Sequence, residues 1–292
     1  VDAAREAFKS WQFSTVEDRV ALLERILSVY ESRAEEFVKI MPYEMGTTIS
    51  FSREVHMPVG IGHIEAAVEA LKSHTFERPS ARGGSTLVDE PVGIVGMITP
   101  WNWPVNQVMI KVAPALAAGC TMVLKPSEYS PLSSVMLAEV LDEAGCPPGV
   151  FNLINGDGEG VGQAITNHPD IHMISFTGST RAGKAITKGA ADTIKRVTLE
   201  LGGKSPNLLF ADANLETAAK ISVDACFINN GQSCDAASRL LVEKSVYKKV
   251  VDLVTAEVAS VKIDDPMVEG THMGPVVNKR QFDNIQNLIK TG

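Results

Sequence analysis

A seven-residue apolar run, Val92-Gly93-Ile94-Val95-Gly96-Met97-Ile98, opens the part of the chain whose pattern predicts the fold class. Residues 105–118 follow with helical periodicity, and a second apolar run occupies 121–124. The alternation continues with helices predicted at 131–144 (N-cap Ser130), 160–166 and 180–191 and strands at 151–154, 171–176 and 196–201. Apolar strands alternating with amphipathic helices predict an α/β fold with a parallel sheet covered on both faces. Ligands of such sheets bind beyond the carboxyl ends of the strands, so residues there are candidate site residues.

The residues before this run predict helices and then an excursion from the core. Thr15 and Asp18 fit a capping box at the start of a helix, and Gly46 fits a helix stop. A second helix is predicted at 53–73. Residues 76–90 are rich in Arg, Ser, Gly and Pro, and they predict a short hairpin.

A second unit is predicted after Gly203. Its elements are strands at 206–210 and 239–242 and helices at 215–226, 245–258 and 279–290. The last helix has no strand after it, and a unit with so few elements does not close a core. The chain is therefore expected to be cut short at its C-terminal end.

The composition restricts the function classes. With 292 residues, 45% hydrophobic and 21% charged, the chain is typical of a globular protein of about two domains. The formal net charge of −8 argues against a general nucleic-acid binder, which needs a basic face. No run of 18 or more apolar residues occurs, so no transmembrane helix is predicted. Four cysteines are sparse at this length and favour reduced thiols in the cytoplasm, with a removed targeting segment before Val1 left open.

Two segments carry the candidate chemistry. Cys234 follows the helix-breaking Asn229-Asn230-Gly231, and Glu200 lies upstream in a segment that ends in two glycines. A thiol nucleophile and a carboxylate base are the groups needed for covalent catalysis at a carbonyl carbon. The other cysteines fit small buried hydrophobic positions, namely Cys120, Cys146 and Cys226. The six histidines form no pair with ligand spacing, which disfavours a Cys–His protease, and no metal site is predicted.

Three segments that follow predicted strands offer polar groups to a ligand. Residues 176–183, Phe-Thr-Gly-Ser-Thr-Arg-Ala-Gly, open a helix whose N-terminus suits a phosphate, although the same turn also fits a plain helix cap. Lys125-Pro126-Ser127-Glu128 can bond ribose hydroxyls, or it can be a solvated loop. Pro100-Trp101-Asn102-Trp103-Pro104 can line a channel with Asn102 as an oxyanion donor, or it can supply core aromatics and a turn. From the residues alone these alternatives stay open.

These motifs occur in one order over positions 100–234, together with Leu199-Glu-Leu-Gly-Gly-Lys-Ser-Pro206 and Asn230-Gly-Gln-Ser-Cys234. In this combination the chain resembles the NAD(P)-dependent aldehyde dehydrogenase superfamily along its whole length. The resemblance implies an aldehyde dehydrogenase-like α/β fold. Residues 1–73 and 91–203 would form a Rossmann-type, parallel-sheet cofactor domain, 74–90 a bridging or oligomerisation hairpin, and 204–292 the N-terminal part of an α/β catalytic domain.

The resemblance also implies a role for each site residue. Cys234 matches the nucleophile that forms a thiohemiacetal and then a thioester, with Asn102 and the Cys234 backbone N–H as oxyanion donors. Glu200 matches the general base that activates water to release the acid. The other matches are the cofactor-pocket residues Thr99, Trp101, Lys125, Ser127, Glu128, Gly178, Ser179 and Gly183, and the substrate-tunnel wall Trp103.

The implied cofactor is NAD. Lys125 and Glu128 match residues that hold the adenosine ribose, and Ser179 matches the pyrophosphate contact. Glu128 suits a free ribose 2′-OH and repels a 2′-phosphate, so NAD is favoured and NADP stays possible. The expected partner is a small-molecule aldehyde, and the family expectation is a homodimer or homotetramer.

Two features depart from the family pattern. The later Glu-x-Phe-Gly-Pro motif and the C-terminal strand that joins subunits are absent because the chain ends at Gly292. Asp235, directly after the cysteine, is less common there than a small or apolar residue, and it would favour a polar substrate.

Three other functions compete with a hydrolytic aldehyde dehydrogenase. A CoA-acylating member, in which CoA replaces water, generally lacks the glutamate found at Glu200. A non-catalytic relative is disfavoured by the retained Cys234, Glu200 and Asn102. A fragment would be inactive even with Cys234 and Glu200 intact. A thioester hydrolase that uses Cys234 without a cofactor would leave the nucleotide-binding scaffold unexplained.

Overall fold

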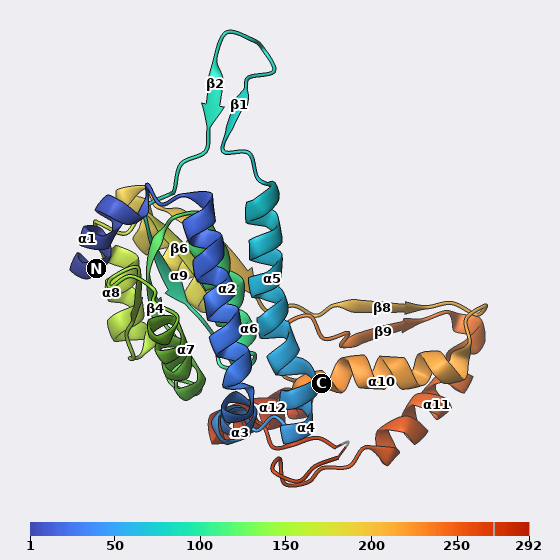
Figure 1. Ribbon diagram of the computed structural model, residues 1–292. Coiled ribbons are helices and arrows are strands. Elements are labelled where there is room, and N and C mark those ends of the chain that lie inside the picture. The colour runs from blue at the N-terminus through green and yellow to red at the C-terminus, as the bar shows by residue number, and fades with distance from the viewer. Residues whose placement is uncertain (271, 292) are drawn as a thin grey trace.

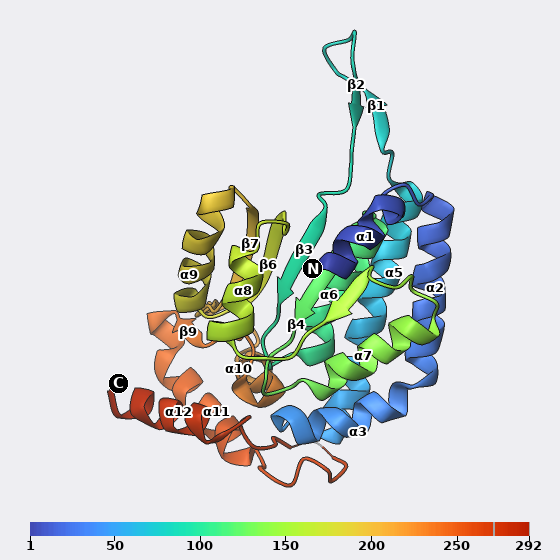
Figure 2. The ribbon, with the colours of Figure 1, turned by 90° about the vertical axis from the view of Figure 1, so that its left-hand side faces the viewer.

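The computed structural model describes residues 1–270 and 272–291, and its centre is a five-stranded parallel sheet (Figures 1 and 2). The strands are β3 (Ile94–Ile98), β4 (Thr121–Lys125), β5 (Phe151–Leu153), β6 (Met173–Gly178) and β7 (Arg196–Leu201). They lie in the order β5-β4-β3-β6-β7, so the chain builds outward on one side of β3 and then crosses to the other. This is the order of a Rossmann-type sheet, and the predicted fold class is confirmed. The topological switch point lies between β3 and β6.

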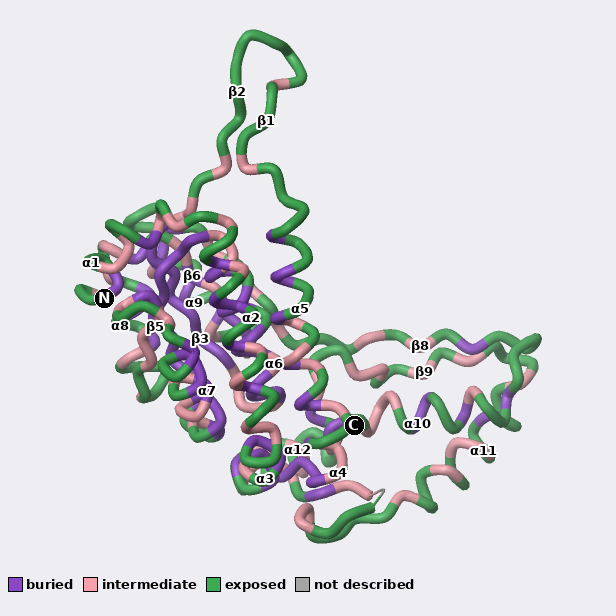
Figure 3. The backbone as a smooth tube through the Cα atoms, viewed as in Figure 1, coloured by how far each residue is buried: buried purple, intermediate pink, exposed green. Residues whose placement is uncertain are grey.

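Helices cover both faces of the sheet. They are α1 (Asp2–Trp11), α2 (Val16–Ser32), α3 (Ala34–Met45), α5 (Met57–Ser73), α6 (Pro104–Ala117), α7 (Leu132–Glu143), α8 (Gln163–Asn167) and α9 (Thr180–Ala190). Successive residues of β3 face opposite cores because side chains alternate along a strand. Val95 and Met97 join a large core with α2, α5, α6 and α7, whereas Ile94 and Ile98 join a smaller one with α8 and α9. Figure 3 shows the buried backbone gathered at this sheet.

Local sequence signals set the ends of the first helices. Thr15 Oγ1 accepts a hydrogen bond from the Asp18 backbone N at 3.1 Å, and Asp18 Oδ2 accepts one from the Thr15 backbone N at 3.2 Å. This is the predicted capping box. Gly46 ends α3 in the left-handed region with φ 80°, also as predicted. The helix predicted at 53–73 ends as predicted but begins earlier, with the short α4 (Ile49–Phe51) and a π-helical turn at Ser52–His56 before α5.

The predicted cap of α7 is wrong. Pro131, not Ser130, occupies the N-cap position, and it makes no side-chain cap. The backbone N of Ser133 instead donates to Glu44 Oε1 of α3 at 3.0 Å. Glu44 is buried, and that burial raises the pKa of its carboxyl group against the opposing hydrogen bond from Ser133. A carboxylate distant in sequence thus replaces the local cap, which a reading of neighbouring residues cannot detect.

The predicted hairpin stands away from the body of the molecule (Figures 1 and 2). Its strands, β1 (Glu77–Pro79) and β2 (Thr86–Val88), pair antiparallel with Arg78 opposite Leu87. Every residue of both strands is exposed. The role in oligomerisation that the resemblance implies stays a prediction.

The second unit consists of β8 (Pro206–Leu209), α10 (Leu215–Gly231), β9 (Arg239–Val242), α11 (Tyr247–Ser260) and α12 (Lys279–Thr291). β8 and β9 pair in parallel, and α10 and α11 lie beside them (Figure 1). Its own buried cluster is small, and it is formed by Leu209, Leu215 and Val250. Across residues 1–270 and 272–291, no helix has the length and apolar composition needed to cross a membrane.

Candidate active site

Cys234 lies in a loop created by a break in α10. The helical backbone ends at Phe227, since Ile228 is extended (φ −48°, ψ 137°) and Asn229 and Asn230 are left-handed (φ 53° and 60°). Asparagine adopts this conformation more readily than most non-glycine residues do, which explains the choice of two asparagines here. The chain therefore leaves the helix sharply, and Cys234 is exposed.

Asn102 is hydrogen-bonded into the same loop. Its Nδ2 donates to the carbonyl O of Gln232 at 2.8 Å, and Asn229 Nδ2 donates to the carbonyl O of Asn102 at 2.6 Å. A primary amide has two N–H groups, so Asn102 can bond the loop and donate to a ligand at the same time. The structure therefore places the predicted oxyanion donor, which follows β3, beside the loop that carries Cys234.

Trp103 supports this loop from the core. It is 8% exposed, and its ring lies 4.6 Å from the ring of His56 and 5.7 Å from that of Phe51, measured between centroids. Its Nε1 donates to Ser233 Oγ at 2.9 Å. The structure therefore supports the core-aromatic alternative for Trp103, and its place in the wall of a substrate channel stays a prediction.

His56 is a buried residue that the sequence did not single out. Its Nε2 lies 3.2 Å from Asn229 Oδ1. Asn229 uses Nδ2 to donate to Asn102, so Oδ1 accepts and His56 Nε2 carries the proton; this tautomer is inferred from the network. Burial lowers the pKa of His56 to about 4, opposed by its hydrogen bond with Asn229. The residues next to His56 in sequence do not distinguish it from a histidine on the exposed face of a helix.

Glu200 lies near the end of β7, opposite Thr177 of β6, and is exposed. The chain then runs to Gly203, where an added Cβ would lie 3.3 Å from the carbonyl O of Cys234. The segment after Glu200 therefore passes against the nucleophile's own backbone. The close approach favours glycine at position 203, which gives the second glycine of the Leu-Glu-Leu-Gly-Gly motif a packing role.

Lys111 of α6 is a second residue that the sequence analysis missed. It is 8% exposed, and its Nζ donates to Ser175 Oγ at 3.1 Å. Burial lowers the pKa of Lys111 to about 8, and the negative charge of Glu200 opposes that shift. A cation thus lies within electrostatic reach of the candidate base. The sequence signal for a buried cation was a lysine within a mostly apolar helix. The same pattern also fits a lysine whose ammonium group extends into solvent.

The candidate cofactor residues gather at one edge of the sheet. Thr99 and Trp101 follow β3, Lys125 ends β4, and Ser179 follows β6. These three strands are neighbours, so their carboxyl ends lie side by side at the switch point. The predicted residues are therefore brought together by sheet order, although they are far apart in sequence.

Lys125 is a buried lysine whose ammonium group is held by hydrogen bonds. It is 3% exposed, so the solvated-loop alternative for Lys125 is wrong. Its Nζ donates to the carbonyl O of Pro126 at 2.9 Å and to Glu128 Oε2 at 3.2 Å, and Glu128 itself is exposed. Ser127 is buried and accepts from the backbone N of Tyr129 at 3.2 Å. The loop presents a carboxylate and a fixed ammonium group to the edge of the sheet.

Ser179 caps α9, and two glycines shape its surroundings. Ser179 Oγ accepts from the backbone N of Ala182 at 3.2 Å, which leaves its own proton able to bond a ligand. An added Cβ on Gly178 would lie 2.6 Å from Cζ of Phe176, and one on Gly183 would lie 3.0 Å from Cδ2 of Leu201. Both glycines are required by close packing rather than by a positive φ.

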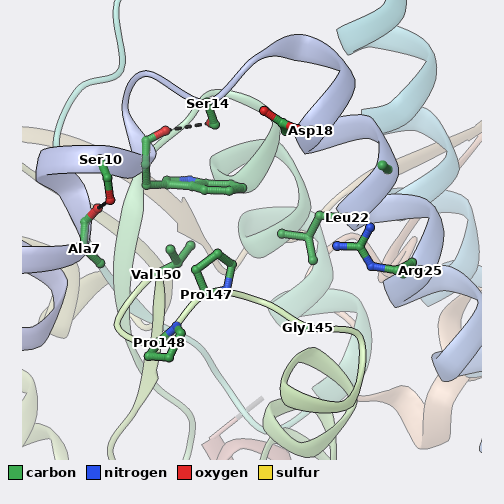
Figure 4. A pocket seen from close by; sticks show the side chains of 12 residues that line it. Ala7, Ser10, Ser14, Asp18, Leu22, Arg25, Gly145, Pro147, Pro148 and Val150 are labelled. Atoms are coloured by element: carbon green, nitrogen blue, oxygen red, sulfur yellow. Dashed lines mark hydrogen bonds between the residues drawn. The ribbon is translucent and has the colours of Figure 1, made fainter.

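Two cavities lie outside this constellation. One of about 410 Å³ is formed by α1, α2 and the loop before β5, where Leu22 and Arg25 face Pro147 and Pro148 (Figure 4). Its lining contains none of the sequence-predicted site residues. A second, of about 650 Å³, lies between α4, α10 and residues 260–262 and 272–273, and is bordered by Asn229 and Asn230. It therefore reaches the loop before Cys234 from the side away from the sheet.

A sequence model described as the aldehyde dehydrogenase family matches residues 1–292. The chain belongs to the aldehyde dehydrogenase family. It is similar to the 3-succinoylsemialdehyde-pyridine dehydrogenase of a Pseudomonas species, with 46% identity over 293 residues. That match covers 100% of this chain and 61% of the relative, so the chain spans about three fifths of the relative's length.

Solved aldehyde dehydrogenases share the fold. The crystal structure of the Bartonella henselae enzyme is 47% identical with a TM-score of 0.97, covering 100% of this chain and 61% of that one. A mutant of Pseudomonas syringae aldehyde dehydrogenase C, in complex with NAD+ and octanal, is 44% identical with a TM-score of 0.97, covering 99% and 59%. The Bacillus cereus enzyme in its NAD+ complex is 37% identical with a TM-score of 0.95, covering 99% and 60%.

Proposed function

We propose that the protein carrying this chain oxidises an aldehyde to the carboxylic acid and passes a hydride to NAD+. The observation that carries the proposal is the 2.8 Å hydrogen bond that ties Asn102 to the loop of the exposed Cys234. An amide donor beside a thiol nucleophile is the arrangement needed to attack a carbonyl carbon and hold the oxygen that becomes negative. The relatives with NAD+ and octanal bound support the same chemistry.

In the first step, the thiolate of Cys234 attacks the aldehyde carbon and forms a thiohemiacetal. The developing oxyanion accepts hydrogen bonds from the second N–H of Asn102 and from the backbone N–H of Cys234. Neither donor has to move, because Asn102 is already held by Gln232 and Asn229. Preorganisation of this kind avoids a reorganisation cost during the reaction.

The residues at the sheet edge fit a dinucleotide. Ser179 and the N-terminus of α9 suit a pyrophosphate, and the pair of Lys125 and Glu128 offers a donor and an acceptor to ribose hydroxyls. The exposed Glu128 favours NAD over NADP, because its charge repels a 2′-phosphate. NAD+, when bound, supplies the acceptor for the hydride that the aldehyde carbon loses.

In the last step, Glu200 takes a proton from water, and the hydroxide equivalent cleaves the thioester on Cys234. The products are the carboxylic acid and the free thiol. Lys111 lies within electrostatic reach of Glu200 and, with a pKa of about 8, carries a positive charge near neutral pH.

The test is formation of reduced nicotinamide with a panel of aldehydes and either NAD+ or NADP+. Turnover should vanish in Cys234→Ala and persist in Cys226→Ala, a matched change on α10. Glu200→Gln should give a burst of about one equivalent and then stall, because the thioester accumulates. Equal turnover in Cys234→Ala contradicts the proposal. Turnover that requires CoA would identify the CoA-acylating alternative instead.

A further inference from the structure

Asp235 places a carboxylate directly beside the candidate nucleophile. It follows Cys234 in sequence, and both residues are exposed. Ser233 Oγ donates a hydrogen bond to Asp235 Oδ1 at 2.6 Å, so the side chains before and after Cys234 are joined. The carboxylate is therefore turned back across the Cys234 backbone toward Ser233.

Trp103 fixes the direction of that hydrogen bond. Its Nε1 donates to Ser233 Oγ at 2.9 Å, and an indole nitrogen can only donate. Ser233 must then direct its own proton elsewhere, and it does so to Asp235. Because Trp103 is packed against His56 and Phe51, the chain of bonds starts from a rigid support. The carboxylate is therefore tied through Ser233 to the buried Trp103.

The carboxylate of Asp235 is hydrogen-bonded but not ion-paired among the residues that the structure describes. Among residues 1–270 and 272–291, no ion pair within 4.0 Å involves Asp235, and its side-chain contact is a neutral hydroxyl. An electrophile that approaches Cys234 therefore comes near a carboxylate that no directly paired cation neutralises. At a separation of about 6 Å, in surroundings between protein and water, one unit charge alters a rate roughly threefold to tenfold.

We propose that Asp235 is a specificity-determining residue, and that its charge favours cationic and neutral aldehydes over aldehydes that carry a carboxylate. The inference rests on the proposed function, because it names the substrate class of the same site. Its physical basis is simple electrostatics at the nucleophile. A positive group on the substrate is attracted as the carbonyl carbon nears Cys234, and a second carboxylate is repelled.

The first experiment needs no catalytic turnover. Alkylation of Cys234 by anionic iodoacetate and by neutral iodoacetamide is followed by mass spectrometry of the peptide that contains it. Asp235→Asn should raise the iodoacetate-to-iodoacetamide rate ratio about threefold to tenfold at low salt. Both reagents attack the same thiolate, so any change in the thiol pKa cancels in the ratio. Added salt should shrink the difference between wild type and variant.

Asp212→Asn is the matched control. Asp212 is an exposed residue just before α10, whereas Cys234 follows the other end of that helix, whose regular part at residues 215–227 is roughly 20 Å long. The same loss of charge there should leave the ratio at the wild-type value. An unchanged ratio in Asp235→Asn overturns the inference, as does an equal rise in both variants.

The second experiment measures kcat/KM for a trimethylammonium aldehyde and a carboxylate aldehyde of equal chain length, with butanal as the neutral reference. Asp235→Asn should lower the cationic-to-anionic ratio about threefold to tenfold, and Asp212→Asn should not. Turnover with an unchanged ratio overturns the inference and leaves the proposed function intact. No turnover with any aldehyde overturns the proposed function and the substrate preference together, while the alkylation ratio still reports the charge at Cys234.

Discussion

Asn102 shows at the residue scale how one side chain serves both the fold and the proposed chemistry. One amide hydrogen bonds the carbonyl O of Gln232, and the backbone carbonyl accepts from Asn229. The second amide hydrogen is the proposed oxyanion donor. An alanine in its place would remove the donor and the bond to the loop together.

Asn102→Ala should lower kcat about 100- to 1,000-fold, the usual cost of removing one oxyanion-hole donor. Asn106→Ala, one turn further along α6, makes the same chemical change away from Gln232 and should have far less effect. Steady-state kinetics with NAD+ and one good aldehyde measure both variants. A kcat for Asn102→Ala within threefold of the wild type would contradict the oxyanion role.

His56 should make stability depend on pH. Its pKa is about 4 when folded and 6.5 as the ordinary value, so below pH 6.5 the unfolded chain binds a proton that the folded chain does not. The free energy of unfolding should therefore fall as the pH drops from 6.5 toward 4, by at most about 3 kcal/mol.

Denaturant unfolding of wild type and His56→Gln across pH 4 to 7 measures this contribution. Glutamine can still donate to Asn229 Oδ1 but does not titrate, so the wild-type curve should be steeper than that of the variant. Parallel curves would show that His56 titrates normally and is not buried as a neutral ring.

At the scale of elements, the turn after α10 depends on two left-handed asparagines. The helix stops because the residues at 229 and 230 adopt positive φ, and Asn230 then anchors the loop on α3 and the residues before α12. Its Nδ2 donates to the carbonyl O of Gly46 at 2.7 Å, and its Oδ1 accepts from the backbone N of Gly274 at 2.9 Å. The end of one helix is therefore fixed by partners from two distant segments.

Asn229→Ala and Asn229→Gly separate backbone strain from the lost hydrogen bonds. Both variants lose the bonds to Asn102 and His56, so both should lose most activity. Only alanine also adds the left-handed penalty, roughly 1–2 kcal/mol, so Asn229→Ala should be less stable than Asn229→Gly by about that amount. Chemical denaturation compares them. Equal stability would mean that the turn relaxes to another conformation in the alanine variant.

At the scale of the whole molecule, the sheet core and the second unit differ in how much they bury. β3 and β4 are buried along their whole length between two cores. β8 and β9 have alternating exposure, and their cluster rests on Leu209, Leu215 and Val250. Local stability follows buried apolar contact, so the two units should open with different free energies.

Native-state hydrogen exchange should therefore be faster in β8 and β9 than in β3 and β4. The expected pattern is exchange of the second unit through local opening, with the sheet protected up to global unfolding. Peptide-resolved exchange detected by mass spectrometry gives the comparison directly. Equal protection of the two units would show that they unfold as one cooperative body.

The sequence carried the fold class and most of the site, because periodicity and motif order are local properties. Strand and helix alternation predicted the parallel sheet, and Asn-Asn-Gly predicted the helix break before Cys234. The features that the sequence did not predict have a shared cause. The cap of α7 comes from Glu44 of α3, His56 contacts Asn229 in the loop before Cys234, and Lys111 contacts Ser175 of β6. Contacts between segments far apart in sequence leave no signature in the neighbouring residues.

Lys125 shows the same limit of sequence-based prediction within a motif that was predicted. Its residue type and its place after a strand were sufficient to nominate it, yet its burial and its bond to Glu128 depend on how the loop packs on the sheet. The chain's own pattern thus determined which elements form, their order and which residues carry chemistry. Packing determined protonation and hydrogen-bond partners, including the tie of Asp235 through Ser233 to Trp103, since burial and electrostatics depend on distances in space rather than along the chain.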